Sequence, residues 1–184
     1  MIAKVQKMKT ALPPLMRFFS AIALTIACSW AAATTFIDLT LDQMIAKTDF
    51  SFFGTVSKIH IEDRGEPWTV VTFTIKVPLL NVDGPTVELS FLGGTLATGE
   101  SLTVNLMPKF TEGEEILVLA YDDSYASPII GFRQGLWRLS PLGFRNEEGL
   151  LLSLTTPGSL TLDGVGGQTE ALLNKLQDLM SKDP

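Results

Sequence analysis

The sequence has few of the residues from which metal sites and catalytic triads are built. Among its 184 residues there is one cysteine and one histidine. Zinc sites need several Cys or His ligands, and a nucleophilic triad needs a histidine beside a nucleophile and an acid. His60 has no such partners in the sequence, and no G-x-S-x-G motif occurs. We therefore predict a protein that is not an enzyme, without metal or cofactor, in which His60 lies on a solvent-exposed strand face.

The single cysteine, Cys28, lies in an N-terminal segment that has the pattern of a secretory signal peptide. No acidic residue precedes Asp38, an apolar run covers residues 18–27, and the small residues Ala31-Ala32-Ala33 follow. We expect cleavage after Ala33, with Ala31 as second choice, and export to the periplasm or the medium. The apolar run is shorter than the roughly 20 residues of a membrane-spanning helix, which argues against a retained anchor. The basic residues of the segment are Lys4, Lys7, Lys9 and Arg17.

Two alternatives remain open for this segment. Ala27 precedes Cys28, which makes Cys28 a candidate for lipidation, although Thr25 stands where lipoprotein signals usually have leucine. The basic region is also long, and a start at Met16 would give a more ordinary signal peptide.

The predicted mature chain, from Thr34 to Pro184, is acidic and has no cysteine. It contains all 20 acidic residues and 10 of the 14 basic residues, which gives a formal charge of −10. An acidic surface repels phosphate groups, so we expect neither nucleic acid nor an anionic membrane surface as a partner, and no membrane insertion after cleavage. Without cysteine, the fold depends on its apolar core and not on disulfides.

A short helix is predicted at the start of the mature chain. Thr40 and Gln43 have the spacing of a capping box. Leu41, Met44 and Ile45 then fall on one helix face. We expect this helix to end near residues 47–48.

The pattern changes to period 2 at Phe50. Phe52 and Val56 share its parity, whereas Ile59 and Ile61 have the opposite parity. A change of parity within one strand predicts a β-bulge or a sharp bend. A long, bent first strand is what a small barrel needs in order to take part in both halves of its sheet.

Further short strands are predicted along the chain, separated by turns that contain Gly and Pro. Their spacing is typical of a sandwich or a barrel. The continuous apolar run at 116–120 predicts a strand buried on both faces, and Gly93-Gly94 predicts a positive φ or a tight corner. Expected strands cover residues 71–77, 87–91, 102–106, 116–120, 129–132 and 136–139.

The last part of the chain has a different composition. Residues 155–167 are rich in Thr, Pro and Gly and are interpreted as a connector. An apolar stripe at helical spacing then predicts a C-terminal amphipathic helix, which either docks on its own domain or is presented to a partner. The expected parts are a signal peptide at 1–33, a β domain at 34–154, the connector at 155–167 and the helix at 168–184. The stripe consists of Leu172, Leu173, Leu176, Leu179 and Met180.

Several motifs between residues 39 and 139 together resemble a group of uncharacterised bacterial exported proteins. The pattern of that group is an "AD…GTV" start, a "TxVTF" strand, a "GG" corner, a "P-x-F-x-x-GE" loop and a final "G…QG" hairpin. The matching residues here are 46–49 with Gly54-Thr55-Val56, then 69–73, Phe91-Leu92-Gly93-Gly94, 108–114 and 130–135.

The resemblance implies a small OB-like Greek-key barrel, distantly similar to the module of the tissue inhibitors of metalloproteinases and of netrins. Members of the group often occur beside secreted metalloproteases, which implies such a protease as a possible partner. The animal inhibitors chelate the protease zinc through an N-terminal cysteine. The mature N-terminus here would be Thr34-Thr35-Phe36, so that mechanism does not carry over.

Four residues are candidate binding residues. OB barrels bind ligands on the face of strands 2 and 3 and in the flanking loops, where Arg64 and Trp68 would lie. Arg133 and Gln134 belong to the predicted final hairpin. Exposed Trp and Arg side chains favour binding hot spots. The alternative is that Trp68 only covers the end of the barrel and Arg64 is solvated.

Two acidic motifs have structural interpretations. Asp122-Asp123-Ser124 could supply oxygen ligands to calcium, but its spacing does not match an EF-hand loop, and an acidic turn is the preferred interpretation. Glu112-Gly113-Glu114 is interpreted as a turn before the buried strand.

Three functions are compatible with these features. The first is a non-catalytic exported module that binds a protein or a glycan outside the cytoplasm. The second is an inhibitor or chaperone of a co-exported metalloprotease. The third is a carboxylate-based hydrolase, which ranks last because strand parity places no pair of acids in one pocket.

Overall fold

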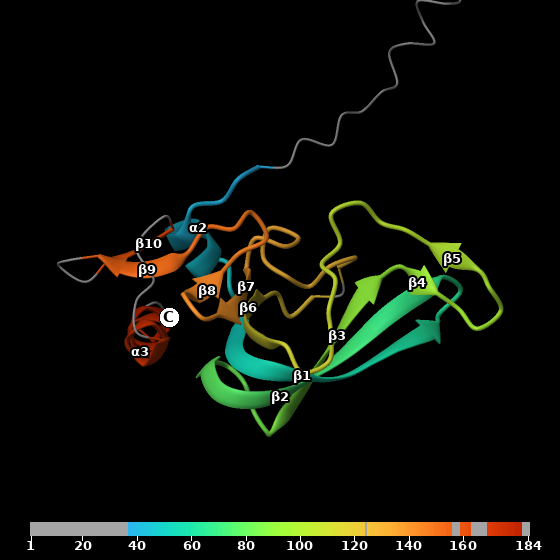
Figure 1. Cartoon of the computed structure of the whole chain (residues 1–184), viewed down its shortest axis with the longest axis horizontal. Helices are drawn as coiled ribbons and strands as arrows, with labels where there is room; N and C mark the ends of the chain where they lie inside the picture. The colour runs from blue at the N-terminus through green and yellow to red at the C-terminus, as the bar shows by residue number, and fades with distance from the viewer. Residues whose placement is uncertain (1–36, 124, 156–158, 163–168, 182–184) are drawn as a thin grey trace, which may run out of the picture. The chain divides into compact units, whose positions relative to one another are not determined.

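The protein is described from a computed structural model, which covers residues 37–123, 125–155, 159–162 and 169–181 (Figure 1). The predicted signal peptide lies outside these residues. The described chain is mainly β, as predicted. Its elements are α2 (Leu41–Ile45), β1 (Phe50–Asp63), β2 (Pro67–Leu80), β3 (Thr86–Leu92), β4 (Gly94–Thr95), β5 (Ser101–Leu102), β6 (Glu115–Ala120), β7 (Leu136–Ser140), β8 (Gly143–Arg145), β9 (Leu152–Thr155), β10 (Ser159–Leu162) and α3 (Thr169–Met180).

Helix α2 begins at the predicted capping box. The Thr40 hydroxyl accepts a hydrogen bond from Gln43 N at 3.3 Å, and the Gln43 side chain accepts one from Thr40 N at 2.9 Å. These bonds satisfy two backbone donors that a helix N-terminus otherwise leaves unpaired. Leu41 and Met44 are buried, as their spacing predicts.

Six strands form one antiparallel sheet in the order β3-β2-β1-β6-β7-β8. Strands β1, β2 and β3 follow one another through turns, and the chain then returns to place β6 on the other side of β1. This is the strand order of a Greek key. Two small hairpins, β4-β5 and β9-β10, complete the β structure of the described residues.

The sheet does not close into a barrel, which corrects the expectation of a closed OB-like tube. Within the described residues, β3 and β8 are the outer strands and do not pair with each other. The predicted strand at 129–132 is not formed: Ile129 makes a single bridge to Ala120, and the chain then turns through Gly131 and Phe132, both at positive φ. The outer edge of β3 therefore meets a loop instead of a strand.

Strand β1 is bent, as the change of parity predicts. Its register with β2 shifts between Val56 and Lys58, so that Ser57 is an extra residue in β1. Two further shifts precede it, one on each side of the Phe52–Phe53 pair. At Gly54 the strands approach so closely that a Cβ atom would lie 2.7 Å from the Thr74 carbonyl oxygen. Bulges and a glycine at such a contact increase strand twist and bending.

The sheet has an apolar cluster on each face. Strand β6 contributes to both clusters, because Leu117 and Leu119 belong to one and Ile116, Val118 and Ala120 to the other. This confirms the prediction that residues 116–120 are buried on both faces. The second cluster is completed by Phe52, Val56, Val71, Phe73, Leu89, Phe91, Ile129 and Leu136.

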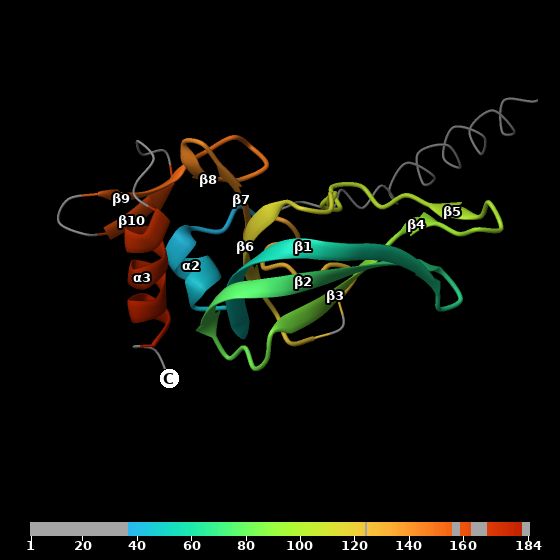
Figure 2. The same ribbon diagram turned by 60° about the horizontal axis from the view of Figure 1, so that its bottom comes forward.

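Helices α2 and α3 cover the first cluster, together with Trp137, Phe144 and Leu152. Leu172, Leu173, Leu176 and Met180 of α3 are buried there. Both views place α3 beside the β9-β10 hairpin (Figure 2). The apolar stripe of the C-terminal helix therefore docks on its own domain. No helix in the described part of the chain is long and apolar enough to cross a membrane.

Two local predictions differ from the structure. Of the strand expected at 102–106, only Leu102 lies in a strand, β5, and the chain turns at Leu106, which has φ of 62°. The segment expected to be a connector contains all of β10 and the last residue of β9, while residues 156–158 and 163–168 lie outside the described residues. At Gly93-Gly94 the predicted positive φ is confirmed, at 110° and 143°.

Candidate functional site

A groove of about 480 Å³ lies between the outer edge of β3 and the loop over residues 121–128 that follows β6. We call it the β3-edge groove. Its volume is in the range of ligand-binding pockets. Three strands contribute side chains, and the loop supplies the opposite wall. The lining residues are Phe50, Arg64, Trp68, Glu88, Leu89, Ser90, Tyr121, Asp122, Asp123, Tyr125 and Pro128.

Two of the four predicted binding residues, Arg64 and Trp68, lie together in this groove. The Arg64 guanidinium lies 5.6 Å from the centre of the Trp68 ring, within the range of a cation–π contact. It also donates to a Glu62 carboxylate oxygen from Nε at 2.9 Å and from Nη2 at 2.7 Å. Nη2 further donates to the Ser90 hydroxyl at 3.2 Å. The guanidinium thereby holds the turn between β1 and β2 against β3.

His60 extends this polar row along β1. Its Nε2 lies 3.1 Å from a Glu62 carboxylate oxygen. The hydrogen bonds from Arg64 first, and from His60 second, hold the pKa of the Glu62 carboxyl below its ordinary value of 4.5. The His60 side chain is half-buried, with 32% of its surface exposed, and its Nδ1 is buried without a hydrogen bond. The expected solvent-exposed position of His60 is therefore found only in part, because Nδ1 of the ring is withdrawn from solvent.

Two tyrosines form the loop side of the groove. The Tyr121 and Tyr125 rings meet edge to face with centroids 5.3 Å apart. Tyr125 is 51% exposed, and its hydroxyl donates to Asp123 at 3.3 Å. The negative charge of Asp123 raises the pKa of the Tyr125 phenol above its ordinary value. Both tyrosines also line a second hollow of about 480 Å³.

The loop is positioned from both ends. Asp49, just before β1, accepts a hydrogen bond from Asp122 N at 3.0 Å. Tyr121 N donates to Pro128 O at 2.8 Å, which closes the base of the loop. Because these bonds fix its base, the loop presents its aromatic and acidic side chains to the groove.

Three carboxylates line the groove: Glu88, Asp122 and Asp123. All three residues are exposed, and Glu88 accepts a hydrogen bond from the Thr72 hydroxyl at 2.9 Å. Among the described residues, no group of three or more His, Cys, Asp or Glu side chains could hold a metal ion. Ser124, the third residue of the candidate calcium motif, lies outside the described residues.

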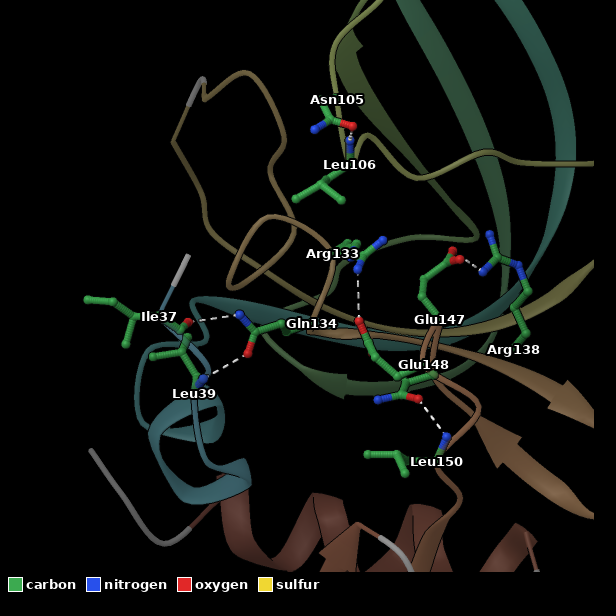
Figure 3. A network of polar contacts seen from close by, with 11 residues as sticks. Ile37, Leu39, Asn105, Leu106, Arg133, Gln134, Arg138, Glu147, Glu148 and Leu150 are labelled. Atoms are coloured by element: carbon green, nitrogen blue, oxygen red, sulfur yellow. Dashed lines mark hydrogen bonds and ion pairs between the residues drawn. The ribbon is translucent and has the colours of Figure 1, made fainter. Parts of the chain in front are cut away.

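The other two predicted binding residues lie elsewhere and contact their own chain (Figure 3). Gln134 binds the backbone of the segment before α2: its Oε1 accepts from Leu39 N at 2.7 Å, and its Nε2 donates to Ile37 O at 3.0 Å. Arg133 pairs with Glu148 at 3.0 Å. Gln134 therefore fastens the start of the described chain to the turn before β7.

A second polar cluster surrounds Arg138 of β7, and Figure 3 shows its pair with Glu147. Its guanidinium pairs with Glu147, donates to the Lys109 carbonyl and lies 3.6 Å from Glu114. These contacts join β7 to the loop before β6 and to the loop after β8. The guanidinium is thus occupied by partners from its own chain, and we assign Arg138 a structural role.

Sequence reasoning missed the residues that complete the groove. Tyr121 and Tyr125 flank an acidic pair directly after the buried strand. This aromatic and acidic pattern could have indicated that the loop contributes to a binding site. Phe50 and Glu88 gave no such signal, because only the fold brings them to the same groove. A comparison with protein families, curated proteins and solved structures finds no match to the chain.

Proposed function

We propose that this chain is an exported, non-catalytic binding module that recognises a protein or a glycan outside the cytoplasm, and that the β3-edge groove is its site. The observation that carries the proposal is the meeting of four aromatic side chains, one guanidinium and three carboxylates in one groove. Aromatic and arginine side chains supply much of the energy of binding sites. Carboxylates add orientation and charge selection.

Export rests on the N-terminal pattern of basic, apolar and small residues, which is typical of a signal peptide. A binding role outside the cytoplasm agrees with a chain that has no cysteine after Ala33 and a formal charge of −10.

A relation to OB-like barrels is part of the proposal. The order β3-β2-β1-β6 and the long bent β1, which pairs with both β2 and β6, support it. OB folds are partly open Greek-key barrels. In an OB-like relation, the groove would lie along the edge of β3, where the sheet is not closed.

The three carboxylates also raise the carboxylate-based hydrolase as a second candidate. A carboxyl group that acts as a general acid is usually withdrawn from water by an apolar pocket. Glu88, Asp122 and Asp123 are all exposed to solvent. Their surroundings therefore favour recognition of a ligand over proton transfer.

The test is photo-crosslinking in the source organism, with the chain exported under its own N-terminal segment. A photoreactive p-benzoylphenylalanine replaces Tyr125 in the groove or, as a control, Leu142, which is 61% exposed and is not a lining residue. We expect an adduct from position 125 that weakens when Trp68→Ala is added, and none from position 142.

The identity of the adduct decides between the possible partners. A metalloprotease would select the inhibitor or chaperone function, and a glycan or another protein would select plain recognition. Equal adducts from both positions, or none from position 125, would overturn the assignment of the groove.

A further inference from the structure

The outer edge of β3 carries backbone groups that no strand of the described chain pairs. Strand β3 has β2 as its single strand partner among the described residues. On the β2 side, Ile75 N donates to Pro85 O at 2.8 Å. On the opposite side, Leu92 N donates to Ala126 O at 2.8 Å. These two bonds define which residues of β3 face each side.

In an antiparallel strand, the N–H and C=O of one residue point to the same side, and the side alternates along the chain. The direction at Leu92 therefore assigns Thr86, Glu88 and Ser90 to the outer edge. Glu88 and Ser90 also line the β3-edge groove. Their backbone N–H and C=O groups thus face the space between β3 and the loop over 121–128.

An unpaired strand edge is a template for an added strand, and proteins usually cover or blunt such edges. Here the loop over 121–128 ties only the end of β3, through the bond from Leu92 to Ala126. Peptide-binding domains use an edge of this kind: backbone bonds supply affinity, and side-chain pockets select sequence.

The charges of the groove indicate the sequence that fits it. Glu88, Asp122 and Asp123 line it, and the one basic lining residue, Arg64, is already paired with Glu62. A cationic side chain is therefore attracted, and an acidic segment is repelled. A second copy of this acidic chain would bring like charges together.

We propose, on the basis of the binding function above, that the groove takes an extended basic segment of a partner protein as an additional strand. The segment pairs with the outer edge of β3 at Glu88 and Ser90. Its lysine or arginine side chains face the three carboxylates, and its remaining side chains contact Trp68 and Tyr125.

The experiment selects binders from a displayed library of random 12-residue peptides on the mature full-length chain. We expect enriched peptides with basic residues at alternate positions and no proline in the pairing region. Their affinity should fall severalfold when salt rises, because exposed charge pairs are screened. Acidic or uncharged consensus sequences, or no enrichment, would overturn the proposal.

Backbone pairing is tested by comparing Glu88→Pro with Glu88→Ala. Both variants lose the carboxylate, but only proline also removes the N–H at the outer edge, where it costs no bond to β2. We expect Glu88→Pro to bind the selected peptides about tenfold more weakly than Glu88→Ala does, as the loss of one hydrogen bond predicts. Equal affinities would contradict strand pairing.

A second measurement leaves the protein unchanged. Each selected peptide is made in two forms, with N-methyl groups on its odd-numbered or on its even-numbered amides. Because only every second amide of an added strand faces β3, we expect one form to lose binding and the other to keep it. If Glu88→Pro disturbs the fold, as judged by circular dichroism, this comparison decides the outcome. Equal binding in both registers would contradict strand pairing.

The two proposals fail separately. If the crosslink from position 125 forms but is the same in Glu88→Pro and Glu88→Ala, the groove is a binding site without strand pairing. A glycan adduct, or a crosslink between two copies of the chain, would likewise leave the groove as a binding site and contradict pairing with a basic peptide strand. If no crosslink forms at position 125, the binding function itself is wrong.

Discussion

At the scale of single residues, the far end of β1 is organised by one arginine. Arg64 contacts the Trp68 ring, the Glu62 carboxylate and the Ser90 hydroxyl, and so links the turn to β2 and β3. These groups are largely exposed, so each contact contributes little to the stability of the fold. Their combined effect is to hold the Trp68 ring and the guanidinium in a fixed arrangement at the proposed binding site.

The pKa of the Glu62 carboxyl depends on its hydrogen bonds with Arg64 and His60. Its pKa is lowered in the folded state, so its interactions stabilise the protein above about pH 4.5, and this contribution is lost as the pH falls through the folded-state pKa. In Arg64→Gln we expect the pKa to rise toward 4.5, and in His60→Gln to rise less, because the bond from Arg64 is the larger cause.

This prediction is checked by NMR titration of the Glu62 side-chain carboxyl carbon in the three proteins. Identical titration curves for the original protein and Arg64→Gln would mean that the pair does not form in solution.

At the scale of elements, helix α3 closes one apolar cluster of the sheet. Leu172 and Leu176 are fully buried in a cluster that also contains Phe53 of β1 and Leu117 of β6. The helix gains stability from this packed face more than from its intrinsic helix propensity. The C-terminal helix is therefore part of the folded unit and is not available as a free partner-binding helix.

Truncation of Leu176 to alanine tests this role. Because the side chain is fully buried, we expect Leu176→Ala to lower the free energy of unfolding by about 2–5 kcal/mol. The neighbouring exposed residue supplies the control, and Gln177→Ala should change it by less than about 0.5 kcal/mol. Denaturant unfolding measures both, and equal stabilities would show that α3 does not pack on the sheet.

At the scale of the whole molecule, the start of the described chain is bound to the fold by Gln134. Gln134 binds the backbone at Ile37 and Leu39, only a few residues after the predicted cleavage site. Removal of residues 1–33 would leave the backbone contacts of Gln134 in place. The described fold, from Ile37 onward, is therefore compatible with a processed chain.

Processing can be measured directly on the exported protein. We expect N-terminal sequencing and intact mass to give Thr34 as the first residue, since Ala33 ends the small-residue run of the signal pattern. Cys28→Ala should leave this product unchanged. An N-terminus at residue 28 carrying a lipid mass, or an uncleaved chain, would contradict the prediction.

The sequence by itself determined the features that depend on a few neighbouring residues. The capping box of α2, the bulge in β1, the doubly buried β6 and the positive φ at Gly93-Gly94 all follow from local spacing and steric rules. Such features are readable because the interactions that cause them lie within one element or one turn.

The tertiary structure decided what depends on distant contacts. Within the described residues the outer edge of β3 pairs with no strand and the sheet stays open, and side-chain parity gives no information on which strands pair. The groove exists because strand order brings Phe50, Glu88 and Tyr121 to one edge, although they are far apart in the chain. The same long-range packing separates Gln134 from Trp68, two residues that sequence reasoning had placed in one class.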